Sequence, residues 1–126
     1  MNKLNIQPVV EERIKIEILD NESGITVKFT GDIDMEDPSL ILDPLFTRIH
    51  DGAVVKDIKT IYADFTDLSF LNSSGIKAVA KWIMKLTELD DDTKYQIKII
   101  HNRDITWQVT SLPTLTFLVP GAVQVE

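Results

Sequence analysis

Two short runs near the start of the sequence alternate apolar and polar residues. Ile14, Ile16 and Ile18 are separated by charged residues, and the range 25–29 repeats this alternation after a turn-rich segment at 20–24. Period-two alternation on both sides of a turn containing Asn and Gly is typical of paired antiparallel strands. We therefore predict a β-hairpin whose second strand runs into Gly31-Asp32-Ile33-Asp34.

Helical and strand-like patterns alternate along the rest of the chain. Asp43 followed by Pro44 suits a helix start, so we expect a first helix over 44–55 and not an unbroken helix from Pro38. An unbroken helix would place Pro44 in its interior, at a cost of about 3 kcal/mol. The remaining predicted elements are a strand at 60–65, a clear amphipathic helix from Ser74-Gly75 to near Asp90, a strand at 95–100, a weaker helix at 105–118 and a strand at 122–125.

The order β-β-α-β-α-β-α-β predicts an α/β fold. In such a fold a mixed sheet with an N-terminal β-hairpin is covered by helices in right-handed crossovers. The 126 residues, 44% hydrophobic and 26% charged, suit a single globular domain over 1–126. We expect residues 1–12 to be a loosely ordered lead.

The formal net charge of −7 argues against nucleic acid as a partner, because phosphate binding needs clustered Lys and Arg. Protein partners are expected instead. The absence of cysteine rules out disulfides and thiolate metal sites and fits a reducing compartment. We find no signal-peptide pattern and no long uninterrupted apolar stretch, so we expect a cytoplasmic protein with no direct membrane insertion.

The candidate chemistry lies in segment 61–85, where a strand-like run reaches Asn72-Ser73-Ser74-Gly75 and opens into the clear helix. The first helical turn has backbone N–H groups without intrahelical partners and carries the positive end of the helix dipole. An anion such as a phosphorylated serine would be stabilised there. Ordinary helix capping explains the same residues without any further function, so both interpretations stay open at this point.

These residues resemble a known family, the STAS domain, which is the fold of bacterial anti-sigma-factor antagonists. The resemblance rests on the order of elements, on Gly31-Asp32-Ile33-Asp34, and on Leu68-Ser69-Phe70-Leu71-Asn72-Ser73-Ser74-Gly75 before a helix. It implies that Ser73, or less readily Ser74, is phosphorylated by a partner kinase and that phosphate blocks partner binding. The implied partners are an anti-sigma factor or serine kinase with a histidine-kinase-like ATPase fold, and a metal-dependent serine phosphatase.

One position departs from the family pattern, which has Asp where this sequence has Asn72. The asparagine keeps the shape of the side chain but lacks its charge, and some family members without a usable phosphosite act as scaffolds. By the same resemblance Asp34 lies beside the serine. The expected partner-binding residues are Asp32, Asp34, Asn72, Ser73, Ser74, Gly75, Lys77 and Lys81.

Other interpretations compete with this switch. Lys77, Lys81 and Lys85 form a basic stripe that is either the solvated face of the helix or part of a docking surface. The acidic residues at 32–37 lack the ligand spacing of a metal site, and we expect no catalytic residue, cofactor or metal. STAS proteins also serve as soluble regulatory subunits of membrane transporters, an alternative that permease genes next to this gene would support.

Overall fold

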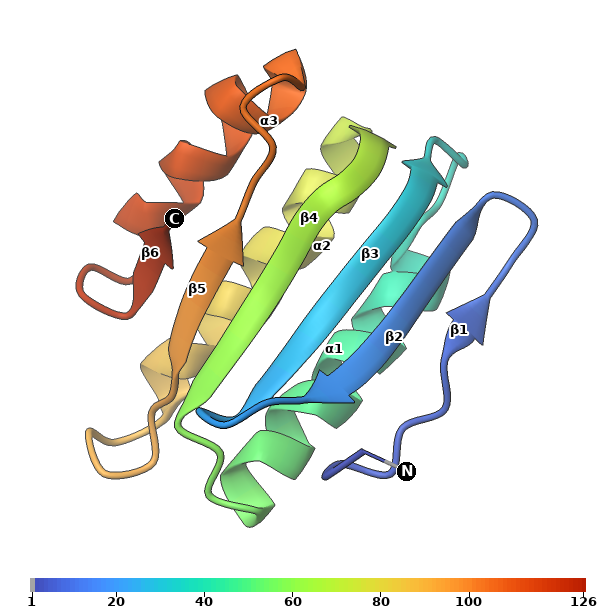
Figure 1. Cartoon of the computed structure of the whole chain (residues 1–126). Helices are drawn as coiled ribbons and strands as arrows, with labels where there is room; N and C mark the ends of the chain where they lie inside the picture. Colours follow the sequence, from blue (N-terminus) through green and yellow to red (C-terminus); the bar gives the residue numbers. More distant parts are fainter. Residues whose placement is uncertain (1) are drawn as a thin grey trace.

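The computed structural model describes residues 2–126, which form one six-stranded sheet with strand order β1-β2-β3-β4-β5-β6 (Figure 1). The strands are β1 (Val9–Val10), β2 (Ile14–Asp20), β3 (Ile25–Ile33), β4 (Thr60–Leu71), β5 (Gln96–Ile100) and β6 (Val123–Val125). The first three pair in antiparallel fashion, and β3 to β6 pair in parallel. The predicted mixed sheet with an N-terminal hairpin is confirmed.

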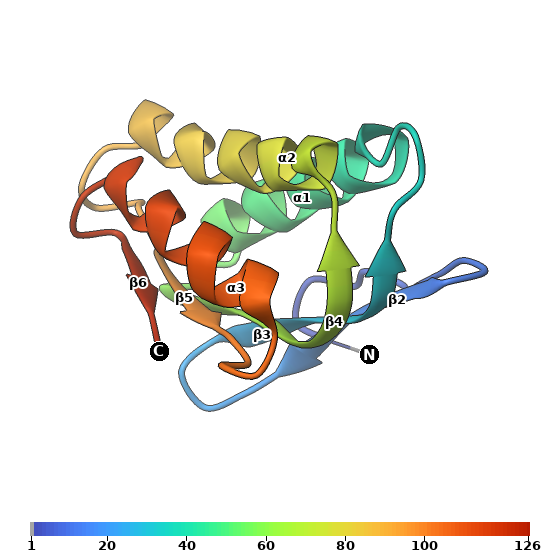
Figure 2. The same ribbon diagram turned by 90° about the horizontal axis from the view of Figure 1, so that it is seen from above.

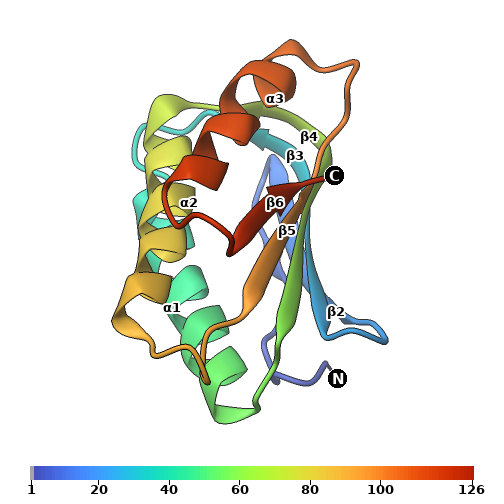
Figure 3. The same cartoon turned by 90° about the vertical axis from the view of Figure 1, so that its left-hand side faces the viewer.

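Helical crossovers join the parallel strands. They are α1 (Ser39–Val55), α2 (Ser73–Met84) with the 3₁₀ turn η1 (Lys85–Glu88), and α3 (Thr106–Ser111) with the 3₁₀ turn η2 (Leu112–Phe117). Figures 2 and 3 show α1 and α2 side by side on one face of the sheet, with α3 and η2 on the same side near β6. Among residues 2–126, no helix lies on the other face of the sheet. Within residues 2–126, no helix combines the length and the apolar character needed to span a membrane.

The core lies between the sheet and the two long helices. Alternate residues of β2 to β5 are buried against the helices, as the period-two patterns predicted. Phe29 and Phe65 stack with ring centroids 4.6 Å apart, and Phe46 of α1 stacks on Trp82 of α2 at 4.8 Å. These aromatic pairs join the two central strands to each other and the two helices to each other.

The expected start of the first helix is wrong, because α1 begins at Ser39 and Pro44 lies inside it. The carbonyl of Pro38 accepts hydrogen bonds from the amides of Ile41 and Leu42, which closes a first turn before Pro44 is reached. Leu42 is buried in the core, which is worth about 1.5–3 kcal/mol. That gain offsets the cost of an interior proline, which is of similar size.

Several other boundaries also differ from the sequence prediction. β4 was expected to end at Phe65 but continues to Leu71, because Leu68 and Leu71 return to the core. The predicted third helix divides into α3 and η2, with Pro113 inside η2. Within the lead at 1–12, Val9–Val10 pairs with β2 and Ile6 is buried, so part of that segment adds to the core in contrast to the expectation.

Gly31 lets β3 bend where it approaches the end of β4. Its φ is +104°, a conformation that side chains rarely adopt, and an added Cβ would lie 1.9 Å from the carbonyl oxygen of Arg13. The pairing of β3 with β4 shifts register between Gly31 and Asp32. The glycine of the Gly-Asp-Ile-Asp motif is thus required by the backbone.

A buried hydrogen-bonded group joins α1, α2 and the start of β5. Trp82 Nε1 donates to the hydroxyl of Tyr95 at 2.9 Å, and that hydroxyl lies 2.8 Å from Nδ1 of His50. The Tyr95 hydroxyl accepts from Trp82, and it can donate to His50 when Nδ1 of that ring is unprotonated. Burial lowers the pKa of His50 below its ordinary value of 6.5, and neighbouring charges of Asp51, Lys85 and Glu88 modulate it.

Replacing Gly31 with Ala should destabilise the fold far more than the same change at Gly121. Gly121 also has a positive φ of 86°, but an added Cβ there meets no atom within 4 Å. We expect a loss of about 1–2 kcal/mol for Gly121→Ala from backbone strain alone and about 3 kcal/mol or more for Gly31→Ala. Urea unfolding measures both, and equal losses would show that the contact with Arg13 is unimportant.

Stability should fall as pH is lowered through the range in which free histidine titrates. The folded-state pKa of His50 is below the unfolded value, so the unfolded chain binds the proton more readily and the stability contribution is lost below pH 6.5. We expect the free energy of unfolding to decrease between about pH 7.5 and 5.5. His50→Asn keeps an acceptor for Tyr95 without titrating, and it should flatten this slope; an unchanged slope would contradict the assignment.

Candidate functional site

The candidate site lies where β4 ends and α2 begins. Asn72 is the N-cap residue, with extended backbone angles, and its Oδ1 accepts a hydrogen bond of 2.8 Å from the amide of Gly75. The carbonyl of Asn72 accepts from the amide of Ile76, which is the first helical hydrogen bond. The sequence Asn-Ser-Ser-Gly therefore starts the helix with asparagine as the cap.

Asn72 also attaches the loop after β3 to the start of α2. Its Nδ2 donates to the carbonyl of Met35 at 2.8 Å, and its backbone amide donates to the carbonyl of Ile33 at 3.0 Å. An aspartate has no donor for the Met35 carbonyl and would place a negative charge beside it. Asn72 is therefore not equivalent to an aspartate without its charge. Its side-chain amide donates a hydrogen bond to Met35 that a carboxylate cannot make.

Neither Ser73 nor Ser74 acts as the helix cap. Ser73 and Ser74 occupy the first two positions of α2, and both are exposed. Neither hydroxyl makes a hydrogen bond to any part of the chain that the structure describes, residues 2–126. The capping role is performed by Asn72 alone, so helix capping does not account for either hydroxyl.

Gly75 permits the close packing of the strand end against the first helical turn. It is buried, and an added Cβ would lie 2.3 Å from Cδ1 of Leu71 and 3.3 Å from Oδ1 of Asn72. The lack of a side chain here keeps the capping bond short. Gly75 is thus a buried residue that supports the packing of the junction, in contrast to its exposed neighbours Ser73 and Ser74.

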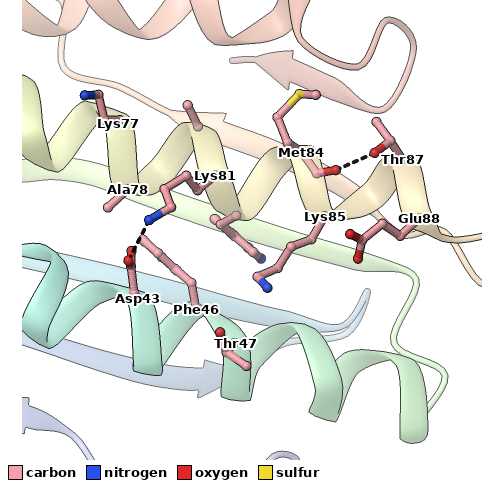
Figure 4. Close-up of a pocket in the computed structure, with 12 residues that line it drawn as sticks. Asp43, Phe46, Thr47, Lys77, Ala78, Lys81, Met84, Lys85, Thr87 and Glu88 are labelled. Atoms are coloured by element: carbon pink, nitrogen blue, oxygen red, sulfur yellow. Dashed lines mark hydrogen bonds and ion pairs between the residues drawn. The ribbon is translucent and has the colours of Figure 1, made fainter.

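The lysines of α2 lie along the helix below the serines. Lys77 follows Ser73 by four residues, so the two share one face of the helix, and Lys77 is exposed. Lys81 forms an ion pair of 2.8 Å with Asp43 of α1 (Figure 4), and the two side chains are 62% and 36% exposed. The predicted stripe thus exists as a surface feature, with its middle member paired.

Asp32 and Asp34 are located at the end of β3, beside the end of β4. Ile33 pairs with Leu71 and Asn72 bonds to Ile33, so Asp34 begins the loop that adjoins the cap. The carboxylate of Asp34 forms an ion pair of 2.8 Å with Arg13, and Asp32 donates its amide to the Arg13 carbonyl. Arg13 is thus held by the Asp34 carboxylate and by the Asp32 backbone amide, and neither aspartate forms a hydrogen bond with the serines.

Sequence patterns did not indicate the contacts that α3 makes with the end of β4. Gln108 is fully buried, and its Nε2 donates to the carbonyls of Phe65 and Leu68 while its Oε1 accepts from the amide of Asn102. Trp107 Nε1 donates to the carbonyl of Ser69 at 2.8 Å. These bonds fix the strand end that leads into the cap. A glutamine in a helical pattern looks like a surface residue, so the sequence alone offered no signal.

The start of α2 offers backbone amides to an anion and does not offer the side chains that hold a metal ion. The amides of Ser73 and Ser74 lie in the first turn, where helical amides lack intrahelical partners. Among residues 2–126, no group of three or more His, Asp or Glu side chains is placed to hold a metal ion. The chemistry available at the junction is that of two exposed hydroxyls at the positive end of a helix.

Two substitutions of Asn72 should distinguish the stability that its capping bond contributes from the stability that its bond to Met35 contributes. Asn72→Ala loses both the cap and the Met35 bond, and we expect a loss of about 1–2 kcal/mol in unfolding free energy. Asn72→Asp keeps the cap and gains about 0.3–1 kcal/mol from a negative charge at the helix start, so its loss should be smaller. Both variants lose the bond that attaches Met35 to Asn72, so a glutamate-specific protease should cleave each of them faster after Glu36. Equal stability of the two variants would contradict separate contributions from the cap and from the Met35 bond.

Comparison with known proteins supports the fold. No protein-family model matches the sequence, and no curated protein matches it. The solved structure of an anti-sigma factor antagonist from Mycobacterium paratuberculosis is similar, with a TM-score of 0.59 and 19% identity, over 91% of this chain and 88% of that chain. The chain therefore has the STAS-like fold that its sequence motifs predicted.

Proposed function

We propose that this protein is a regulatory protein-interaction module whose partner binding is controlled by phosphorylation of Ser73. The observation that carries the proposal is the exposed Ser73 hydroxyl at the first position of α2, with the cap supplied by the neighbouring Asn72. A hydroxyl with no structural bond can be modified without unfolding the helix that carries it. The similarity to an anti-sigma factor antagonist supports a regulatory role on this fold.

Phosphate on Ser73 would change the surface more than the fold. It adds about −1.5 to −2 charge and three acceptor oxygens directly over unpaired helical amides. Lys77, one helical turn away on the same face, offers a cation within reach of the modified side chain. The phosphate would thus be stabilised locally, while a partner that docks on the unmodified surface would meet new bulk and charge.

The resemblance supplies the partners for this proposal. They are an anti-sigma factor or a serine kinase with a histidine-kinase-like ATPase fold, and a metal-dependent serine phosphatase. Both enzymes need an accessible serine, and the exposed junction satisfies this requirement for Ser73 and Ser74. We assign the phosphate to Ser73 on the family pattern, and to Ser74 only as the second choice. The protein itself needs no catalytic group for this role.

Mass spectrometry of the protein isolated from its own cells tests the proposal. We expect an 80 Da mass increase on a fraction of the chains, about one phosphate each, that phosphatase treatment removes and that fragmentation places on Ser73. Ser73→Ala should abolish the modification. Ser74→Ala is the matched control, because that hydroxyl is equally exposed one residue away, and it should retain the phosphate.

Two results would overturn the assignment. Phosphate that persists in Ser73→Ala would place the modification elsewhere. Unmodified protein under every growth and stress condition sampled would favour the scaffold alternative, in which the same surface binds its partner without a switch.

A further inference from the structure

The residues that precede β2 lie along its outer edge (Figure 1). We call residues 2–10 the N-terminal segment. In an antiparallel sheet the backbone groups of alternate residues point to the same side of a strand, and in β2 those of Ile14 and Ile16 point away from β3. The amide of Glu11 donates to the carbonyl of Ile14 at 3.0 Å, and Val9 lies opposite Ile16. This end of the β2 edge is therefore paired.

Two polar residues extend this cover to the far end of β2. Nδ2 of Asn2 donates to the carbonyl of Ile18 at 3.2 Å, which is the next outward backbone group of the strand. The amide of Lys3 donates to the carboxylate of Asp20 at 2.8 Å, and its Nζ donates to two carbonyls of the turn between β2 and β3. The N-terminal segment thus covers the whole outer edge of β2.

Little apolar burial holds the segment in place. Ile6, 3% exposed, is its one fully buried apolar side chain, and Leu4 lies in part against Gly52 of α1. Val10 is 67% exposed, and Pro8 has no amide to donate. Fixing each residue of such a segment costs backbone entropy, which one buried side chain offsets only in part. The segment can therefore leave the edge without unfolding the central strands.

The uncovered edge of β2 would fit a second copy of itself. In an antiparallel pair centred on Ile16, the outward groups of Ile14 meet those of Ile18 of the second copy, and Ile16 meets its own equivalent. Lys15 then lies directly opposite Glu17 of the second copy, on the sheet face without helices, and the two-fold axis repeats this contact. Both side chains are accessible for it, since they are 53% and 24% exposed.

We propose that the outer edge of β2 is a dimerisation surface for a second copy of this chain and that the N-terminal segment covers it. Displacing the segment opens the edge, and pairing of two β2 strands then joins two sheets into one. The charge pattern favours this partner, because Lys15 and Glu17 exchange places across the two-fold axis. The surface goes beyond the Ser73 proposal and does not depend on it.

Ile6→Asp in the full chain tests the cover. A carboxylate at this buried position lacks a partner, so it should expel the segment. Sedimentation velocity at about 0.15 M salt, which screens the repulsion between chains of net charge −7, should show self-association at least tenfold tighter than that of the parent. Val10→Asp is the matched control. It introduces the same residue into the same segment at a side chain that is 67% exposed, and it should behave as the parent does.

Charge variants test the register of the pair. Added to Ile6→Asp, the substitution Glu17→Lys places lysine opposite lysine at both contacts and should weaken the dimer about tenfold. Adding Lys15→Glu as well restores opposite charges in reversed order, and the dimer should return to within about twofold of its strength in Ile6→Asp alone. That recovery would show that the variants are folded and that β2 lies in the interface.

Four results would overturn the proposal. A folded Ile6→Asp variant that associates no more tightly than the parent would show that the segment covers no interface. A dimer unaffected by Glu17→Lys, or one that the charge swap fails to restore, would place the contact elsewhere. Loss of the native far-UV circular dichroism in Ile6→Asp would show that the segment is an inseparable part of the core. None of these results bears on Ser73, because phosphate mapping does not involve β2.

Discussion

The parallel pairing of β3 with β4 positions the other elements of the molecule. These two strands form the centre of the sheet, their inward residues Phe29 and Phe65 stack, and both long helices pack over them. Their pairing is irregular between Lys28 and Thr30 and again between Gly31 and Asp32, and at the second place Gly31 bends β3 close to the Arg13 carbonyl. That bend brings Ile33 opposite Leu71 and so brings the loop after β3 beside the start of α2.

The candidate site is built on this meeting of strand ends. Asn72 receives its position from β4 and makes bonds to Ile33 and Met35 that come from β3 and its loop. Gln108 and Trp107 hold the other side of the same strand end. The serines next to Asn72 are therefore presented by a rigid support while their hydroxyls stay free. Such a surface suits a modification that must alter recognition without altering the fold.

The second layer of the molecule has its own organising contact. Phe46 on Trp82, with Trp82 bonded through Tyr95 to His50, fixes the spacing of α1 and α2. At the surface above this buried contact lies a hollow whose lining includes Lys77, Lys81 and Lys85 of α2. The exposed end of α2 and the hollow are thus two consequences of one helix pair. The first depends on the cap at Asn72 and the second on the packing below it.

Local sequence patterns were enough to predict the order of elements, the mixed sheet and the position of the serines at a helix start. These follow from local patterns, since alternation and helical spacing are set by which residues must face one core. Three features became evident only in the folded molecule: α1 passes through Pro44, β4 reaches Leu71, and the side-chain amide of Asn72 donates to a carbonyl 37 residues earlier. Each of these features depends on burial in the core or on a hydrogen-bond partner that is distant in sequence. The local propensities of the residues carry no information about either. For the same reason Gln108, whose partners lie 40 and 43 residues away, looked like a surface residue until the fold placed it in the core.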